Sequence, residues 1–191
     1  MLIDIPYNRD RAIEYARRWA LSRNPLFIDF TGRGGDCTSF VSQCLFAGCG
    51  VMNYTPTFGW YYISSDNRAP AWAGVDELFN FLTGAPQFAD VNGGTGPRGI
   101  DARAGTDIEI ADIIQLQNDM GEFYHSLIIS GFTDNDILVC AHSDDALDRP
   151  ISTYNFASLR VIHIEGARLN VDSDSFFAPL INGEQIIQRN N

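Results

Sequence analysis

Apolar residues recur at every third or fourth position in three segments of the first half of the chain. This spacing is that of amphipathic helices, and it predicts helices over residues 9–23, 37–46 and 75–82. Asn8 is placed to cap the first helix. Glycines follow the second and the third helix, as is typical of helix ends.

In the second half of the chain, apolar positions alternate with polar ones. The alternation predicts strands over residues 112–117, 122–130, 136–142 and 159–165. Their short connections indicate an antiparallel meander or a small open barrel. Because helices precede strands, we expect an α+β fold with N-terminal helices packed on this sheet. A glycine-rich loop is expected over residues 92–106, and no element is assigned to the tail, residues 167–191.

Composition excludes several classes of protein. With 191 residues, of which 45% are hydrophobic, the chain has the size of one globular domain over residues 1–191. Its formal net charge of -11 disfavours nucleic acid and anionic membrane surfaces as partners. All 13 basic residues are arginines, so no lysine is present to anchor pyridoxal phosphate or to complete a P-loop. We therefore expect no cofactor.

The sequence also bears on membranes and export. No apolar run approaches the roughly 18 residues of a membrane-spanning helix, so no span is predicted. Charged residues and a proline interrupt residues 1–20, which do not have the pattern of a signal peptide. A fragment of a longer exported protein would show the same pattern, so the localisation stays open, as does the oligomeric state.

The chain has four cysteines, too few for a disulfide scaffold in a protein of this length. Three of them, Cys37, Cys44 and Cys49, follow one another closely and raise the possibility of a zinc site that also uses a histidine. Their spacings match none of the short Cys-x-x-Cys motifs, so we expect no metal. A zinc module stays as an alternative.

Cys37 has the sequence context of a catalytic nucleophile. It directly follows Asp36 and opens a predicted helix, where free backbone N–H groups and the helix dipole favour a thiolate. Gly34 and Gly35 leave room for a substrate carbonyl, and the N–H of Cys37 is a candidate oxyanion donor. The simplest role for Asp36 is to cap the helix.

Two histidines are candidates to activate this cysteine. His125 lies within one predicted strand and His142 at the end of the next. A hairpin centred between Thr133 and Asp134, or one residue later, places both histidines on one face of the sheet. His142 could then orient His125, which would act as the base. A turn of the other parity would separate them, and Asp144 is the alternative third residue.

Residues 34–43, Gly-Gly-Asp-Cys-Thr-Ser-Phe-Val-Ser-Gln, resemble the nucleophile helix of the family of putative amidase domains. That family is related to the NlpC-type and CHAP-type cysteine peptidases, which have a papain-like fold. The resemblance covers about residues 7–165, with further matching segments at residues 17–20, 24–25, 59–61, 112–115, 125–126, 142–145 and 149–150.

The resemblance implies a cysteine hydrolase that cleaves an amide or peptide bond through an acyl-enzyme on Cys37. It implies that His125 is the base and His142 the third polar residue. Papain-like enzymes carry a glutamine as oxyanion donor six residues before the cysteine, where this chain has Thr31. Relatives often act on cell-wall peptides, so peptidoglycan is a candidate substrate.

Four residues are candidates to bind the substrate: Asp36, Trp60, Tyr61 and Trp72. The aromatic residues within 54–72 could line a groove that stacks sugar rings or peptide planes, although each of them could equally fill the core. This segment supports the alternative function, a catalytically inactive relative that binds glycan or peptide through residues 54–72.

Overall fold

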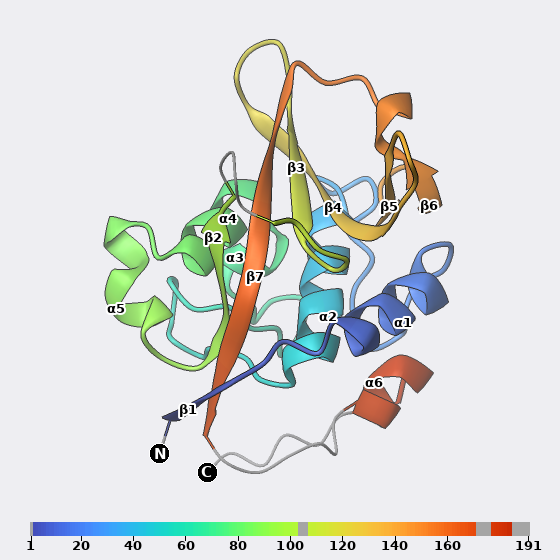
Figure 1. Ribbon diagram of the computed structural model, residues 1–191. Coiled ribbons are helices and arrows are strands. Elements are labelled where there is room, and N and C mark those ends of the chain that lie inside the picture. Colours follow the sequence, from blue (N-terminus) through green and yellow to red (C-terminus); the bar gives the residue numbers. More distant parts are fainter. Residues whose placement is uncertain (1, 103–106, 171–176, 185–191) are drawn as a thin grey trace.

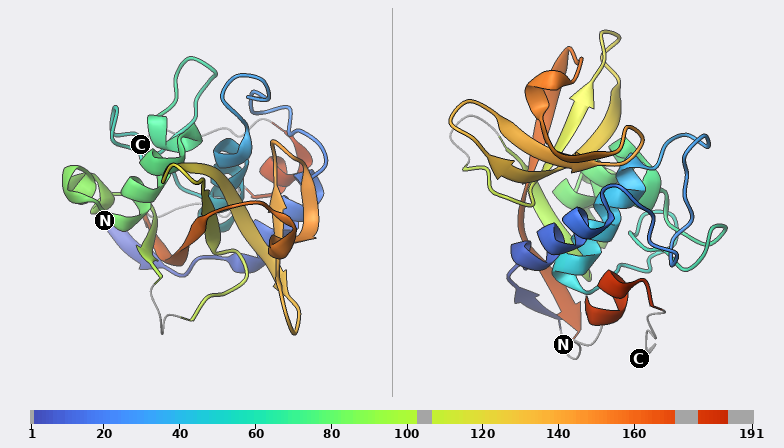
Figure 2. Two further views of the ribbon diagram at one scale, coloured as in Figure 1. Left: turned by 90° about the horizontal axis from the view of Figure 1, so that it is seen from above. Right: turned by 90° about the vertical axis from the view of Figure 1, so that its right-hand side faces the viewer.

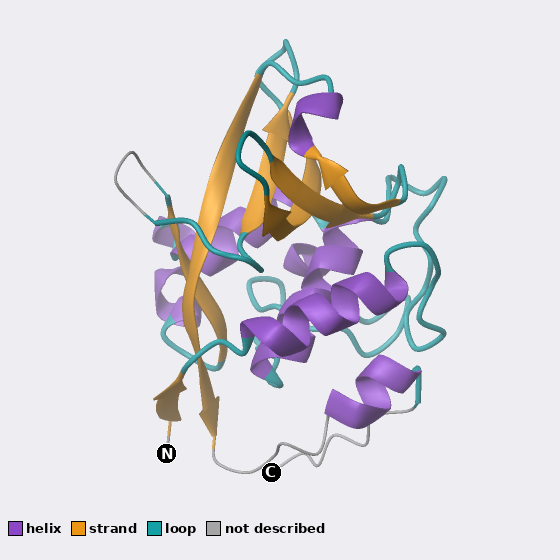
Figure 3. Cartoon of the chain, turned by 45° about the vertical axis from the view of Figure 1, so that its right-hand side comes forward, coloured by secondary structure: helices purple, strands orange, loops and turns teal. Residues whose placement is uncertain are grey.

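The computed structural model describes residues 2–102, 107–170 and 177–184. An antiparallel sheet runs through the molecule, and its long strand β7, Ser158–Asn170, pairs with three other strands (Figure 1). The main helices lie on one side of this sheet (Figure 3). This mixed arrangement is compatible with the predicted α+β class. No helix in the described part of the chain is both long and apolar enough to cross a membrane.

The three predicted helices are confirmed as α1, Arg9–Trp19, α2, Cys37–Cys49, and α4, Val75–Thr83. Asn8 caps α1, since its side chain accepts a hydrogen bond of 3.0 Å from Arg11 N–H. Left-handed glycines end α2 and α4, as their lack of a side chain allows. The remaining helices are short: α3, Pro70–Ala73, α5, Ala89–Asn92, α6, Phe177–Asn182, and the 3-10 turns η1, Pro86–Phe88, and η2, Ile151–Thr153.

The four predicted strands are confirmed as β3, Ile113–Gln117, β4, Phe123–Phe132, β5, Ile137–Ala141, and β7. Alternation did not reveal three short strands: β1, Leu2–Ile5, β2, Gly96–Asp101, and β6, Ala146–Pro150. The sheet order is β1-β7-β3-β4-β5-β6, and β2 also pairs with β7. Strands β3 to β6 therefore form the expected meander, but β7 returns to lie between β1 and β3.

The prediction of a loop over residues 92–106 is wrong in part, and the tail had no predicted element. The expected loop over residues 92–106 contains β2, and its residues 103–106 lie outside the described residues. The unassigned tail begins within β7 and includes α6, whereas residues 171–176 and 185–191 lie outside the described residues. Part of the predicted loop is a strand because β2 pairs with β7 over its whole length.

The sheet separates two hydrophobic clusters. The larger cluster joins α1, α2 and α4 to one sheet face, through strand residues such as Ile113, Ile128 and Cys140. Figure 2, in its right-hand view, shows α1 and α2 side by side against the sheet. The smaller cluster lies on the opposite face of β3, β4 and β5 and includes Leu116, Leu127 and Val139. The face on which a strand residue lies therefore decides whether it meets the helices.

A buried carboxylate, Asp112, joins the start of β3 to α1 and β7. One of its oxygens accepts hydrogen bonds from Arg9 at 2.7 Å and from the backbone N–H of Ile164 at 3.0 Å. The other oxygen accepts from the backbone N–H of Glu109 and from His163 Nδ1, both at 2.8 Å. Since its side chain is fully buried, these four donors replace the water that the carboxylate loses on folding.

We expect Asp112→Ala to lower the free energy of unfolding by about 3 kcal/mol, because it leaves Arg9 and His163 without their buried acceptor. Asp4→Ala is the matched control, since the Asp4 side chain is 67% exposed and pairs with Arg98 and Arg168. It should cost less than about 1 kcal/mol. Urea unfolding measures both values, and equal losses in the two variants would contradict this role of Asp112.

Candidate active site

Cys37 is the first residue of α2, as predicted, and every residue of this helix is buried. The helix lacks a side-chain cap, because the Asp36 carboxylate points away from its N-terminus. In the described part of the chain, no hydrogen-bond acceptor faces the backbone N–H groups of Cys37, Thr38 and Ser39. These amides are therefore available to an oxyanion next to the Cys37 thiol.

Asp36 binds the segments around it instead of capping the helix, so its predicted role as a cap is wrong. Its Oδ1 accepts a hydrogen bond of 3.1 Å from Phe30 N–H, and its Oδ2 lies 2.6 Å from His142 Nδ1. The guanidinium of Arg23 approaches the same Oδ2 at 3.5 Å. Asp36 is 1% exposed, so the carboxylate has no access to a substrate and its predicted substrate contact is not supported.

His142 has partners on both ring nitrogens. Nδ1 meets Asp36, and Nε2 donates to the carbonyl oxygen of Trp19 at 2.9 Å. The ring also stacks on Phe40, with centroids 4.0 Å apart. No ring nitrogen is left to bond to His125, so the geometry assigns His142 to holding Asp36 and α1 rather than to orienting the base.

The prediction that both histidines share one face is wrong because of a β-bulge. Near the turn, Phe132 pairs with Ile137, which is one of the two expected registers. The register shifts at Ser130, so that Ile128 pairs with Cys140. A shift of one residue moves side chains to the other face. His142 consequently faces the helices, and His125 faces the smaller cluster.

His125 lies directly opposite Leu116 of β3 and is 6% exposed. Its ring packs near those of Tyr124 and Tyr154, at centroid distances of 6.0 and 5.9 Å. Burial lowers the pKa of His125 to about 4, attraction by Asp144 opposes this shift, and repulsion by Arg149 adds to it. At neutral pH the imidazole is uncharged and able to accept a proton.

Hydrogen bonds bring the start of α2 to the strand position beside His125. Thr38 Oγ1 and Ser126 Oγ are 3.0 Å apart, and Ser126 also accepts from Gln115 Nε2 at 3.1 Å. Cys37 Sγ lies 3.8 Å from Thr38 Oγ1. The residues that follow Cys37 and His125 are thus in direct contact. Among the described hydrogen bonds, none joins Cys37 Sγ to the His125 ring.

Several residues that support this arrangement were not expected from the sequence. Ser143 Oγ accepts a hydrogen bond of 2.5 Å from Asp36 N–H, which ties the turn after β5 to the residue before Cys37. Arg23 binds Asp145 with two hydrogen bonds of 2.9 Å and approaches Thr31 Oγ1 at 3.4 Å. The cluster of polar residues at 142–145 was the feature of the sequence that could have indicated these contacts. In these contacts, the partners of these residues lie more than 100 positions away in the chain.

Two of the three aromatic candidates lie in the core. Trp60 and Trp72 are fully buried, with ring centroids 5.1 Å apart, and Trp60 Nε1 donates to Ser42 Oγ at 3.0 Å. Their burial supports the alternative expectation, that these rings fill the core, since a fully buried ring cannot stack on a ligand. Tyr61 is only partly buried and packs near Tyr54, with ring centroids at 5.5 Å.

All four cysteines are buried, and Cys37 is 6% exposed. Burial raises the pKa of Cys49 to about 12 and also raises the pKa values of Cys44 and Cys140. Within residues 2–102, 107–170 and 177–184, no group of three or more His, Cys, Asp or Glu side chains is placed to hold a metal ion. In this part of the chain, no set of side chains supports the alternative of a zinc site.

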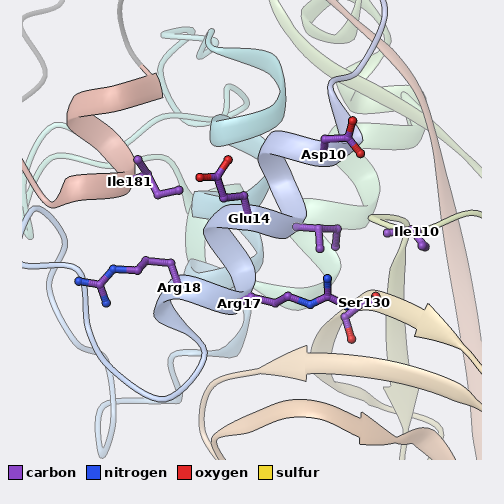
Figure 4. Close-up of a pocket in the computed structure, with 8 residues that line it drawn as sticks. Asp10, Glu14, Arg17, Arg18, Ile110, Ser130 and Ile181 are labelled. Carbon is purple, nitrogen blue, oxygen red and sulfur yellow. Dashed lines mark hydrogen bonds between the residues drawn. The ribbon is translucent and has the colours of Figure 1, made fainter.

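A pocket lies elsewhere, on the outer side of α1 (Figure 4). Glu14, Arg17 and Arg18 of α1 line it together with Ile110 and Ile181. Arg17 reaches across the pocket to the carbonyl oxygen of Ser130, at 3.0 Å. None of the predicted site residues lines this pocket, so it is separate from Cys37.

Comparison with known families agrees with the resemblance seen in the sequence. Residues 6–164 match the family described as "Putative amidase domain". The chain belongs to this amidase family. Membership indicates amide hydrolysis as the type of reaction, and the matched region contains Cys37, His125 and His142.

Among curated proteins, the amidase domain is similar to the uncharacterized protein YhbB of Bacillus subtilis (strain 168), with 26% identity over 126 residues. The alignment covers 64% of this chain and 37% of that relative, so the chain spans little more than a third of the relative's length. No solved structure matches this chain.

We expect the imidazole signals of His125 to titrate with a midpoint near pH 4, in an NMR titration assigned with His125→Gln. An unfolded histidine titrates near pH 6.5, so the unfolded chain binds more protons between about pH 4 and 6.5. The His125 contribution to stability is therefore complete above about pH 6.5 and is lost as the pH falls toward 4. His125→Gln should remove this part of the pH dependence, and a midpoint near 6.5 would contradict the buried, neutral imidazole.

We expect Asp36→Ala to lower the free energy of unfolding by about 3 kcal/mol, because it removes the buried acceptor of His142 and of Phe30 N–H. Asp29→Ala, at a side chain that is 44% exposed and also pairs with Arg23, is the control and should cost less than about 1 kcal/mol. Denaturant unfolding distinguishes the two. A small effect of Asp36→Ala would show that His142 finds another partner.

Proposed function

We propose that this amidase is a cysteine-dependent hydrolase in which Cys37 is the nucleophile and His125 the general base. The contact between Thr38 and Ser126 carries the proposal, because it joins the residue after Cys37 to the residue after His125. The helix start supplies free N–H groups, and the strand supplies a neutral imidazole. A thiol, a base and oxyanion donors are the parts that acyl transfer requires.

The reaction proceeds through two acyl transfers. His125 takes the proton of the Cys37 thiol, and the sulfur attacks the carbonyl carbon of the amide. The oxyanion accepts hydrogen bonds from the free N–H groups at the start of α2. The C–N bond then breaks, and the amine leaves with the proton from His125. Water, deprotonated by the same imidazole, releases the acid product and restores the thiol.

The proton transfer requires β4 to twist or change register at His125, since His125 faces the smaller cluster and Cys37 opens the helix on the other face of the sheet. Two features permit this movement. β5 pairs with β4 only from Ile128 onward, and the ladder between β3 and β4 is irregular beyond His125. Catalytic hydrogen bonds often close only when substrate binds.

A papain-like arrangement and a cell-wall peptide substrate complete the proposal. A nucleophile on a helix N-terminus, packed against an antiparallel sheet that carries the base, supports the relation to the NlpC-type and CHAP-type enzymes. Peptide bonds of peptidoglycan are the substrate class that this relation favours. The rival function, binding without catalysis through residues 54–72, loses support because Trp60 and Trp72 are buried in the core.

Incubation with purified peptidoglycan and with simple dipeptide amides tests both the reaction and the substrate class. We expect Cys37→Ser to lower the rate of hydrolysis roughly 1000-fold, because the nucleophile is lost. Cys49→Ser is the control and should keep the activity, since Cys49 is buried and donates to the Val51 carbonyl oxygen. Iodoacetamide should modify Cys37 first and abolish activity, as burial raises the pKa values of the other thiols.

Hydrolysis that survives Cys37→Ser would exclude the cysteine mechanism. Binding of peptidoglycan fragments without turnover, unchanged in Cys37→Ser, would favour the rival function.

A further inference from the structure

The turn after β5 has an unusual backbone. Ser143 and Asp144 have φ angles of 66° and 149°, in the region that favours glycine. Two consecutive residues with side chains in this region imply local strain that the surrounding contacts hold in place. Such strain is found preferentially at functional sites, so we consider the contacts of Ser143 and Asp144 in this turn.

The turn is fixed against the candidate active site. Ser143 Oγ accepts from Asp36 N–H, and a side chain on Gly35 would come within 3.3 Å of the same oxygen. β5 ends at Ala141 and β6 begins at Ala146, so Ser143 and Asp144 lie in the turn between these two strands. Asp144 directly follows the residue that fixes this turn to Asp36, just before the start of α2.

A chain of contacts connects Asp144 to the His125 ring. Arg149 Nη1 donates to Asp144 Oδ2 at 2.5 Å, and the Arg149 guanidinium lies 3.9 Å from the centroid of the Tyr154 ring. The Tyr154 ring in turn lies 5.9 Å from that of His125. Asp144 Oδ1 accepts no hydrogen bond from the described residues, so one carboxylate oxygen remains available.

We propose that Asp144 is the positioning residue for His125, in the place that the family resemblance gives to His142. The inference rests on the proposed function of Cys37 and His125. Oδ1 accepts a hydrogen bond from the imidazole N–H that points away from Cys37, and it stabilises the imidazolium formed when the thiol proton moves to His125. Arg149 holds the carboxylate through Oδ2 and packs on Tyr154, the ring that lies next to His125.

The charges around His125 agree with this role. Asp144 and Arg149 are the charged groups that act on the ring, with opposite effects on its pKa, and Tyr124 and Tyr154 are the ionisable aromatic residues beside it. Leu116 of β3 faces it without charge. The negative charge of Asp144 thus favours the protonated form of His125. His142, in contrast, is bonded to Asp36 and Trp19.

Alkylation of Cys37 by iodoacetamide at pH 6, followed by mass spectrometry, measures base assistance without a known substrate. We expect Asp144→Asn to slow it about 10-fold, since the imidazolium loses its partner. Asp144→Glu should restore most of the rate. The matched control is Asp145→Asn, because Asp145 is the adjacent acid but binds Arg23. It should change the rate less than twofold.

The NMR titration of His125 provides a second readout that a merely structural role would not move. Asp144→Asn should lower the His125 pKa, and Arg149→Gln should raise it above about 4, since each removes one of the two opposing charges. Circular dichroism verifies that each variant is folded. An unchanged rate and an unchanged pKa in Asp144→Asn would overturn the proposal.

The two hypotheses fail in different ways. If His125→Gln slows alkylation and Asp144→Asn does not, Asp144 is not the positioning residue, and the pair of Cys37 and His125 stands. If His125→Gln leaves the rate unchanged, the proposed base is wrong, and the role of Asp144 is overturned with it.

Discussion

The buried carboxylate of Asp36 holds together the segments that meet at the start of α2. It accepts from Phe30 N–H, pairs with His142 and lies near Arg23, while its own N–H donates to Ser143. A carboxylate without water must satisfy its oxygens within the protein, so each of these segments is fixed relative to the next. Cys37 follows Asp36 directly, and its position is therefore a consequence of this network.

The same network explains why α2 begins without a side-chain cap. A capping aspartate would occupy the N–H groups that an oxyanion needs, and turning the carboxylate toward His142 leaves them free. The second half of the site comes from β4, through the contact of Thr38 with Ser126. Gln115 extends this contact to β3, and it also accepts from Arg160 at 2.7 Å, which reaches β7. The geometry of the candidate site thus depends on three strands and one helix terminus.

Burial on the two faces of the sheet gives the histidines different roles. His142 faces the helices, where acceptors meet both of its ring nitrogens and make it a structural link between β5, α1 and Asp36. His125 faces the opposite side, where the described residues form no hydrogen bond with its ring and burial keeps it neutral. A neutral imidazole with unused nitrogens is suited to proton transfer, and an imidazole with two fixed partners is not.

Local patterns in the sequence determined much of this protein. The spacing of apolar residues predicted α1, α2 and α4, alternation predicted β3, β4, β5 and β7, and Cys37 was expected at a helix start. These features depend on neighbouring residues alone. The strands β1, β2 and β6 escaped prediction because apolar and polar residues do not alternate clearly along them. β1 and β2 gain their hydrogen bonds from the distant β7, and β6 gains them from the neighbouring β5.

Only the tertiary structure decided how the candidate residues are used. The hairpin turn between β4 and β5 has a register expected from the sequence, but one extra residue at Ser130 reverses the faces of everything beyond it. The alternation of apolar and polar residues in the sequence does not indicate such a bulge. Likewise, packing between segments far apart in the chain determines the partners of Asp36 and the burial of Trp60 and Trp72. The residues next to these positions in the sequence do not indicate such packing.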